Sequence, residues 1–326
     1  MNDQLEEKVN LEGISSQAFK QKLSTNTITN LETTILTDAG KSTYSVKAIP
    51  MQQSEIQKEI NHEQGQKVWT LKNGMLTFKV APEYFPSMYS LTTHTKEWLD
   101  HSFPKPGPKS WWNPWGGGVH TLPGNVNLYT LLKQTRSASF VTQLDQWGHK
   151  WKGIQLDIDF IDHPDWMGMK LRQFYLTLPQ SPIVATYYEI SHPNQLLTAD
   201  EFRSVSFLDK QNALLKYFPY ESDTQWKFSG QEGIELSGSQ LSPILRVWDE
   251  KATEGLTIIP TNGDADIYSN AEALVYETSQ THTATPDTAS VRSNPTYYCV
   301  TDELHSTSGW EWLKQLRFME GNHESH

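Results

Sequence analysis

Cysteine and positive charge are scarce in this sequence of 326 residues. It contains one cysteine, and 27 Lys and Arg residues face 38 Asp and Glu residues, for a formal net charge of −11. A lone Cys299 can form neither an intramolecular disulfide nor a cysteine-ligated zinc cluster. Its setting, Tyr-Tyr-Cys-Val, is typical of an inert core thiol. The acidic balance makes nucleic acids and anionic membrane surfaces poor partners.

Long apolar runs and short catalytic motifs are also missing. No stretch approaches the roughly 20 apolar residues of a membrane span, and the N-terminal MNDQLEEKVNLEG lacks the basic region and apolar core of a signal peptide. There is no G-x-S-x-G motif and no phosphate-binding glycine loop, and the histidines of the aromatic segments lack metal-motif spacing. We therefore expect a soluble, cytoplasmic protein without metal or cofactor, or a segment cut from a longer chain.

Strand and turn signals fill the chain from Thr25 onward. Residues 1–24 are polar, without a sustained apolar stripe, and predict a tail or linker. After them, short segments rich in Thr, Val, Ile, Tyr and Phe alternate with Gly, Pro, Asn and Asp. The clearest unit is VWTLK, Asn73-Gly74 and MLTFKV, which predicts a hairpin with a type I′ turn. Its second arm alternates apolar and polar residues, which predicts one buried and one solvated face.

Alternation of apolar and polar residues recurs later in the sequence, with one interruption. In IQLDIDF the apolar residues predict that Asp157 and Asp159 face away from the core, as a solvated strand face rather than a catalytic pair. In LRQFYLTLP the alternation slips at Arg172-Gln173, which predicts a β-bulge. Helical spacing is confined to four apolar residues near the C-terminus: Trp310, Leu313, Leu316 and Phe318. Many strands without an internal repeat predict an all-β protein, a large antiparallel sandwich or barrel.

The densest aromatic segment is SFPKPGPKSWWNPWGGGVHTLPG, at residues 102–124. Prolines in its first half disfavour a helix and a central strand, and its three consecutive glycines permit close approach of the backbone. We therefore expect Trp111, Trp112 and Trp115 in a long irregular connection, and loops of this kind are functional or disordered. Three tryptophans argue against disorder. Two interpretations stay open: the tryptophans plug one end of the sandwich, or they form a platform for a ligand.

Two further aromatic clusters follow, DQWGHKWK at 145–152 and DHPDW at 162–166. Both combine Trp with His, Asp or Gln in a turn. Sugars need this mixture, because an aromatic ring stacks on the C–H face of a pyranose while polar groups satisfy its hydroxyls. Protein-binding surfaces also favour Trp and Tyr. The composition therefore indicates a binding surface, for a sugar or for a protein.

Acid and base candidates are few. His120 follows the three glycines, and its alternative interpretation is a loop histidine that is hydrogen-bonded to the backbone. Glu189 and His192, in YYEISHPN, bring an acid and a base to the end of one strand. No pair of carboxylates can be assigned to a glycosidase mechanism, because the required separation is spatial.

The order of segments near the start of the β-rich region resembles a known family. LKNGMLTFKVAPEYFPSMYSLTTHTKEWLDHSFP contains a hairpin, an x-P-x-x-x-P turn, a second strand, a polar turn and then Glu-Trp-Leu-Asp. This order resembles the opening of galactose mutarotase-like domains, and YYEISHPN stands where such domains have a strand that ends in an Asn-containing turn. The resemblance implies one antiparallel β-supersandwich over 25–318, a polar tail at 319–326, and a carbohydrate-facing concave sheet with the tryptophan loops at its rim.

Two motifs of the aldose epimerases in this family are absent. The corresponding regions read WWNPWGGGVHTLPGN and ISHPNQL in place of an early Asn-x-Arg and a central Asn-His-x-x-Phe-Asn. Epimerase catalysis is therefore not carried over. If the chain is an enzyme, the resemblance implies a sugar epimerase, or a glycoside hydrolase or lyase.

The leading hypothesis is a domain that binds or processes a mono- or oligosaccharide. The residues expected to contact the sugar are Trp111, Trp112, Asn113, Trp115, Trp147, His149 and Trp151. The residues expected to move protons, if the domain is catalytic, are His120, His192 and Glu189. The alternative is a non-catalytic β-sandwich module that packs on a partner domain of a larger protein.

Overall fold

Strands make up most of the computed structural model. The structure describes residues 29–37, 40–48, 54–93, 96–191, 197–210, 213–219, 226–229, 233–236, 241–249, 254–261, 264–285, 290–301 and 311–319. Within these ranges, the helical segments are α1 (Leu128–Leu132) and the 3₁₀ helix η1 (Glu311–Gln315). The expected all-β class is thereby confirmed.

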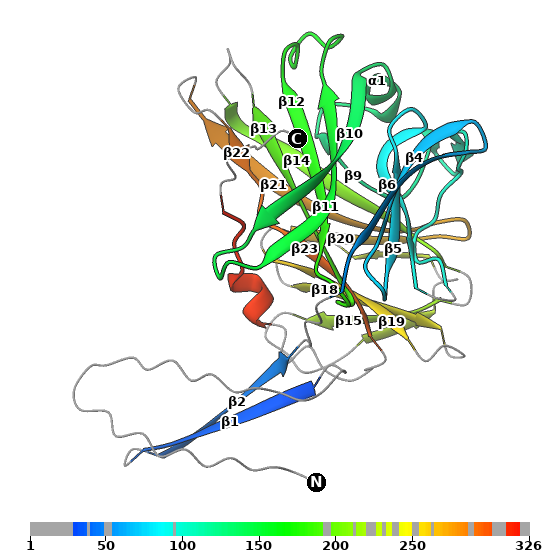
Figure 1. Ribbon diagram of the computed structural model, residues 1–326. Coiled ribbons are helices and arrows are strands. Elements are labelled where there is room, and N and C mark those ends of the chain that lie inside the picture. Colours follow the sequence, from blue (N-terminus) through cyan, green and yellow to red (C-terminus); the bar gives the residue numbers. More distant parts are fainter. Residues whose placement is uncertain are drawn as a thin grey trace.

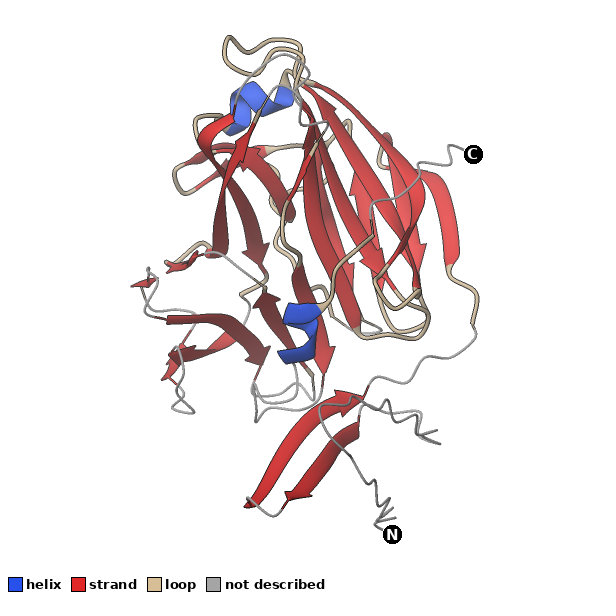
Figure 2. Cartoon of the chain, turned by 90° about the vertical axis from the view of Figure 1, so that its left-hand side faces the viewer, coloured by secondary structure: helices blue, strands red, loops and turns tan. Residues whose placement is uncertain are grey.

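Two large antiparallel sheets face each other, and a separate hairpin of β1 (Thr29–Thr37) and β2 (Gly40–Ala48) projects from one end (Figures 1 and 2). Sheet I has the order β10 (Thr135–Leu144), β11 (Lys150–Asp159), β12 (Lys170–Thr177), β13 (Ile183–Ser191), β23 (Thr296–Thr301), β19 (Gly255–Pro260), β18 (Leu241–Asp249), β15 (Ala213–Pro219) and β16 (Trp226–Ser229), with β22 (Val291–Arg292) on β13. Sheet II has the order β17 (Ile234–Leu236), β20 (Asp264–Ser269), β21 (Leu274–Ala284), β14 (Leu197–Leu208), β9 (Val119–Pro123), β6 (Phe85–Thr92), β5 (Thr77–Ala81), β4 (Gln66–Lys72) and β3 (Gln57–Glu63). The expected large antiparallel sandwich is therefore confirmed.

Alternating side chains of both sheets fill the space between them. On β11, Leu156 is fully buried between the sheets, while Asp157 and Asp159 face away from the core, as expected. The outer faces also carry buried aromatic residues. Trp151, on sheet I, lies beneath the chain's C-terminal segment, and Tyr84 lies on sheet II. Because both faces of each sheet are covered in places, simple alternation fails in several strands.

The predicted hairpin of β4 and β5 is confirmed, but the type I′ turn is wrong. Lys72 pairs with Thr77, so four residues connect the strands, and of Asn73 and Gly74 only Gly74 has a positive φ, 97°. The buried Asn73 side chain donates to Thr177 Oγ1 at 2.7 Å and accepts from nearby backbone N–H groups. Asn73 therefore joins the hairpin to sheet I instead of forming a tight turn.

The predicted β-bulge at Arg172-Gln173 is also wrong. The register of β12 with β11 and β13 is continuous through these residues. Gln173 is buried between the sheets, and Phe174 is buried on the outer face of sheet I. The alternation slips because both faces of β12 are buried, not because a residue is inserted.

Residues 102–124 are more regular than expected. They form the short hairpin of β7 (Gly107–Lys109) and β8 (Trp112–Trp115), and then β9, a central strand of sheet II. The close backbone approach predicted from the glycines is present. A Cβ on Gly117 (φ 76°) would collide with the backbone of Asp100, and one on Gly118 (φ 71°) with that of Met88. The glycines therefore let β9 enter the sheet directly after the hairpin.

The C-terminal segment has a three-residue period because it is a 3₁₀ helix rather than an α-helix. Leu313 and Leu316, at or just beyond η1, are buried against sheet I, and Trp310 lies outside the described residues. Among the described residues, no helix is long and apolar enough to cross a membrane.

Candidate functional site

The predicted site residues fall into two groups on opposite outer faces of the sandwich. Val119 packs between the sheets, so the next residue, His120, points out from sheet II. Tyr188 also packs between the sheets, so Glu189 points out from sheet I. The group at sheet II contains Trp111, Trp112, Asn113, Trp115 and His120. The group at sheet I contains Trp147, His149, Trp151 and Glu189.

Trp111 is a supported, exposed ring on the β7–β8 hairpin. It exposes 62% of its surface. Its ring centroid lies 4.8 Å from that of Trp112 and 4.7 Å from that of Tyr268, and Trp112 packs edge-on against buried Phe207 at 5.0 Å. We call Trp111, Trp112 and Tyr268 the Trp111 platform. Rings anchored in sheet II hold its outermost indole in place, which lowers the entropy lost when a ligand binds.

Polar groups flank the platform. Asn270 donates from Nδ2 to Ser110 Oγ at 3.1 Å and to Tyr268 Oη at 2.9 Å. Lys210 donates to the Asn270 carbonyl, and burial, with a further contribution from nearby Lys109, lowers the pKa of Lys210. Asn113 is exposed on the same hairpin as Trp111. Amide, hydroxyl and ammonium groups thus lie beside an exposed ring, which is the mixture that sugar hydroxyls require.

Trp115 and His120 lie beneath the platform, out of reach of a ligand. Trp115 is 5% exposed and packs on Phe207. His120 is 1% exposed, stacks on Phe207 and meets Phe85 edge-on. Burial, and secondarily Arg203, lowers the pKa of His120 to about 3, so the imidazole is neutral at physiological pH. This packing makes both residues supports for the platform rather than contacts for a sugar.

Asp145 organises the turn that presents Trp147. Its Oδ1 accepts the backbone N–H groups of Trp147 and His149, both at 2.9 Å, and its Oδ2 accepts Trp151 Nε1 at 3.1 Å. Burial raises the pKa of the Asp145 carboxyl, but hydrogen bonds from Trp151, His149 and Trp147 outweigh burial and hold this pKa below its usual range. The turn is therefore built around an ionised carboxylate.

Trp147 is exposed, and its ring neighbours are Trp312 and His149. The exposed fractions are 50% for Trp147, 44% for Leu144 and 53% for Met319, and the Trp312 ring lies 6.3 Å from that of Trp147. The Met319 N–H donates to the Leu144 carbonyl at 2.7 Å, which joins the two segments. We call Leu144, Trp147, Trp312 and Met319 the Trp147 patch. Its large exposed side chains are apolar and the His149 ring lies beside Trp147, whereas amide and hydroxyl groups flank the Trp111 platform.

Trp151 and Glu189 hold the C-terminal segment on sheet I. Trp151 is 1% exposed and meets Phe318 edge-on at 5.4 Å. Glu189 forms an ion pair with Arg292, which also donates to the Phe318 carbonyl at 2.8 Å. His192 lies outside the described residues. The two described members of the predicted acid–base set, His120 and Glu189, therefore lie on different faces and do not share a site.

A small polar cavity lies between the sheets. Thr121, Gln173, Ser204 and Gln280 are among the residues that line it. Its volume of about 10 Å³ holds about one water molecule, whereas ligand pockets start near roughly 300 Å³. The cavity is therefore too small for a sugar ring.

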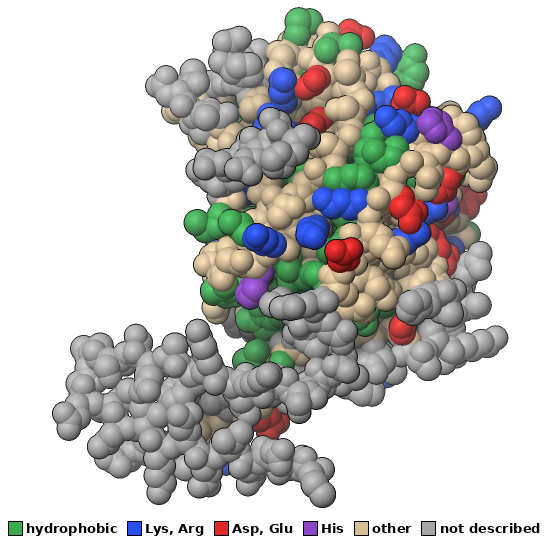
Figure 3. All heavy atoms as spheres, viewed as in Figure 1, with side chains coloured by type: hydrophobic (Ala, Val, Ile, Leu, Met, Phe, Trp, Pro, Cys, Tyr) green, Lys and Arg blue, Asp and Glu red, His purple; other side chains and the backbone are tan. Residues whose placement is uncertain are grey.

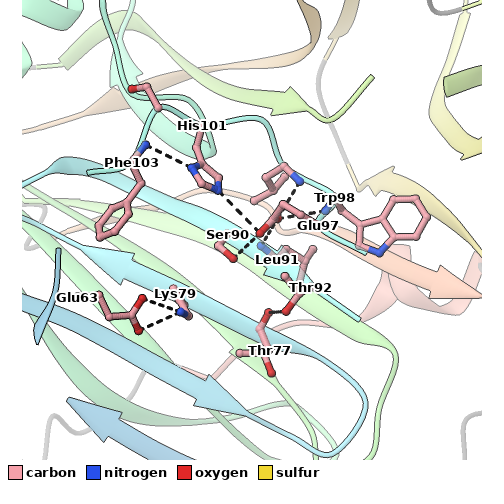
Figure 4. Close-up of polar contacts among 12 residues, drawn as sticks. Glu63, Thr77, Lys79, Ser90, Leu91, Thr92, Glu97, Trp98, His101 and Phe103 are labelled. Atoms are coloured by element: carbon pink, nitrogen blue, oxygen red, sulfur yellow. Dashed lines mark hydrogen bonds and ion pairs between the residues drawn. The ribbon is translucent and has the colours of Figure 1, made fainter. Parts of the chain in front are cut away.

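A cluster of charged side chains on the outer face of sheet II was missed in the sequence (Figure 4). Glu97 accepts the Leu91 and Leu99 backbone N–H groups at 2.8 and 3.0 Å and the Ser90 hydroxyl at 2.5 Å. His101 Nδ1 accepts the Phe103 N–H at 3.3 Å, so the ring proton is on Nε2, which lies 3.9 Å from Glu97 Oε2. A Glu four residues before a His is too common a spacing to have signalled this cluster.

Ser90, Glu97 and His101 are the residue types of a hydrolase triad, but their order is wrong for one. The carboxylate lies between the serine and the imidazole, so the imidazole cannot accept the serine proton. The cluster instead fixes the chain that leads to the β7–β8 hairpin, where Asp100 forms an ion pair with Lys109. Among the described residues, no group of three or more His, Cys, Asp or Glu side chains is arranged to hold a metal ion.

Comparison with known proteins supports the fold alone. No protein-family model and no curated protein matches the sequence. A TPR-domain containing protein from Parabacteroides distasonis aligns with 74% of this chain at 11% identity and a TM-score of 0.54, and this chain spans 48% of that protein. A galactose mutarotase related enzyme from Lactobacillus acidophilus aligns with 74% of this chain, over 98% of its own, at 9% identity and a TM-score of 0.48.

An alpha-galactosidase from Geobacillus stearothermophilus also aligns, over 75% of this chain and 41% of its own, at 10% identity and a TM-score of 0.48. At 11% identity the similarity to the Parabacteroides protein concerns the fold alone, and the two similarities with TM-scores below 0.5 carry no argument. This chain spans about half the length of the Parabacteroides protein.

Proposed function

We propose that the protein binds a carbohydrate on the Trp111 platform. The observation that carries the proposal is a tryptophan with 62% of its surface exposed, supported by two aromatic rings and flanked by the hydrogen-bonded group of Asn270, Ser110 and Tyr268. An exposed indole gains by stacking on the C–H face of a sugar, and the flanking groups can exchange hydrogen bonds with its hydroxyls. The open surface favours a chain of sugars over an enclosed monosaccharide.

Binding, rather than catalysis, is the function that this geometry favours. His120 is neutral and buried beneath the platform, and Glu189 is paired with Arg292 on the other sheet. An acid–base reaction on a sugar needs both groups within reach of one substrate. The platform itself supplies stacking and hydrogen bonding, and we assign no proton transfer to it.

The test titrates the intact chain and Trp111→Ala with a panel of oligosaccharides. Tryptophan fluorescence and calorimetry measure the binding. We expect Trp111→Ala to weaken binding about tenfold or more, which corresponds to about 1.4 kcal/mol. Trp147→Ala is the matched control, because it removes another exposed indole, 50% against 62% for Trp111, from the Trp147 patch. Binding that persists in Trp111→Ala and disappears in Trp147→Ala would move the site to the other face.

A second candidate function, a module that packs on another protein domain, is favoured by the Trp147 patch. Exposed Leu144, Trp147 and Met319 give it the apolar character of a protein contact rather than of a sugar site. If no saccharide changes the fluorescence of the intact chain, while Trp147→Ser abolishes association with a partner domain, this second function replaces the first.

A further inference from the structure

Strand β10 forms an edge of sheet I that lacks the protection found at the other sheet edges. Edge strands β16 and β17 have only four and three residues, and β3, QKEINHE, carries charges along its length. By contrast, β10, TRSASFVTQL, has ten residues, one charge at Arg136, and an unbroken register with β11. Long, regular edge strands with few charges are sites where another strand adds to a sheet.

The hydrogen-bond pattern between β10 and β11 identifies the backbone groups of β10 that face the open edge. The Asp145 N–H donates to the His149 carbonyl, so the odd-numbered residues of β10 bond to β11 in the continuous register. The even-numbered residues therefore direct N–H and C=O groups away from β11. Leu144 supports this assignment, because its carbonyl faces outward and accepts the Met319 N–H. No other described strand pairs with this edge.

The chain's own C-terminal segment already adds to the end of this edge. Met319 N–H bonds Leu144, and the Gln146 N–H donates to the Arg317 carbonyl at 2.9 Å. The part that remains open runs from Thr135 to Gln143 and is centred on Ser139. Ser139 is exposed. On either side of it, the residues whose backbone N–H and C=O groups face the open edge are Arg136, Ala138, Phe140 and Thr142.

The open stretch of β10 can pair with the same stretch of a second copy. When a second β10 lies antiparallel across a twofold axis at Ser139, Ala138 stands opposite Phe140 and Arg136 opposite Thr142. Each of these residues faces its counterpart with an outward N–H and C=O, and no like charges are opposed. A register shifted by one residue would place inward-facing groups opposite outward ones. A shift by two would need the Leu144 carbonyl if the axis moved to Phe140, or the Gln134 N–H if it moved to Ala138, and both groups are already bonded, to Met319 and Leu131.

We propose that a second copy of this chain occupies the β10 edge, so that sheet I of both copies becomes one continuous sheet. The net charge of −11 opposes association, but charges farther apart than about 8 Å are screened at physiological ionic strength. Figure 3 shows Lys and Arg side chains among acidic and apolar ones on the face that carries β10, without a continuous acidic patch. The dimer therefore becomes stronger when salt is added.

Sedimentation equilibrium of the intact chain tests the proposal. We expect the mass to rise with concentration from 37.3 kDa toward twice that value, more steeply at higher salt. Ser139→Lys and Ser139→Glu each place two like charges in direct opposition at the axis, so each variant alone stays monomeric. An equimolar mixture of the two restores the dimer, because the opposed charges then attract. Asn61→Lys, on exposed edge strand β3, is the matched control and leaves association unchanged.

Ala138→Pro gives an independent test of the register. Proline removes an N–H that faces away from β11, so the folded monomer tolerates it, whereas the dimer loses a ladder bond. We expect an unchanged melting temperature and a monomeric mass. An intact chain that stays monomeric at every concentration overturns the proposal. A dimer that is unaffected by the charged substitutions at Ser139, or a mixture that fails to reassociate, also overturns it.

Discussion

The Trp111 platform and the Trp147 patch begin with similar sequence signals and become different surfaces. Each tryptophan stands in a turn beside Gly or Pro and polar residues. In the fold, Trp111 acquires Tyr268 and Asn270 from the β20–β21 region, whereas Trp147 acquires Trp312 and Met319 from the C-terminal segment. Trp115 and Trp151, in the same two segments, are buried, so local sequence does not determine which ring is exposed. The distant segment that folds beside each ring determines what it can bind.

The largest expected effect separates the buried and exposed tryptophans of the turn at Asp145. Trp151→Ala removes a side chain that is 1% exposed and packed on Phe318, and should lower the free energy of unfolding by about 3–5 kcal/mol. Trp147→Ala, at 50% exposure, should cost less than about 1 kcal/mol. Urea denaturation of both variants measures the difference. Equal losses would show that Trp147 is a structural plug and not an available surface.

Asp145→Asn probes how the Trp147 patch is held. The amide has one oxygen, so it cannot accept both the backbone N–H groups of Trp147 and His149 and the Trp151 Nε1 proton, and we expect a loss of about 2–3 kcal/mol at neutral pH. The folded-state pKa of Asp145 is depressed, so its stabilising effect is present above pH about 4 and is lost as the pH falls through the folded value. Denaturation from pH 7 to pH 3 should therefore show a shallower acid loss in Asp145→Asn. Identical slopes would contradict the carboxylate's role.

His120 gives the Trp111 platform a different response to acid. Burial, and secondarily Arg203, lowers its folded-state pKa to about 3, so below pH about 6.5 the unfolded chain binds a proton that the folded chain does not. Stability is therefore full above pH 6.5 and falls as the pH decreases, by about 2 kcal/mol at pH 5. His120→Leu should flatten this part of the profile. A profile as steep in His120→Leu as in the intact chain would contradict this role.

Much of the fold was predictable because it depends on local patterns. The hairpin at Asn73-Gly74 and the outward direction of Asp157 follow from turn chemistry and strand alternation. The β-bulge at Arg172 was wrong because alternation signals assume one buried face, and β12 is buried on both. The chain after Gly118 was expected to be irregular, yet it forms a central strand, because the glycines serve strand packing.

The site was less predictable, because its groups come from segments that are distant in sequence. His120 and Glu189 were expected to serve one substrate, but strand parity places them on opposite outer faces. Asn270 and Tyr268, which flank Trp111, had no signal in the sequence, since an Asn in a turn is common and nothing local links it to a tryptophan about 160 residues away. The order β20, β21, β14 and β9 in sheet II brings them to the same side of the molecule as the β7–β8 hairpin.

The smallest expected effect concerns the polar rim that distinguishes the platform from the patch. Asn270→Ala removes the amide that links Ser110 and Tyr268 while leaving the stacked rings in place. We expect saccharide binding to weaken by about threefold to tenfold, as for the loss of one hydrogen-bonding group worth about 1 kcal/mol. Leu144→Ala at the patch should leave binding unchanged. Because Trp111 still stacks in Asn270→Ala, a loss as large as that of Trp111→Ala would mean that the rim, rather than the indole, dominates recognition.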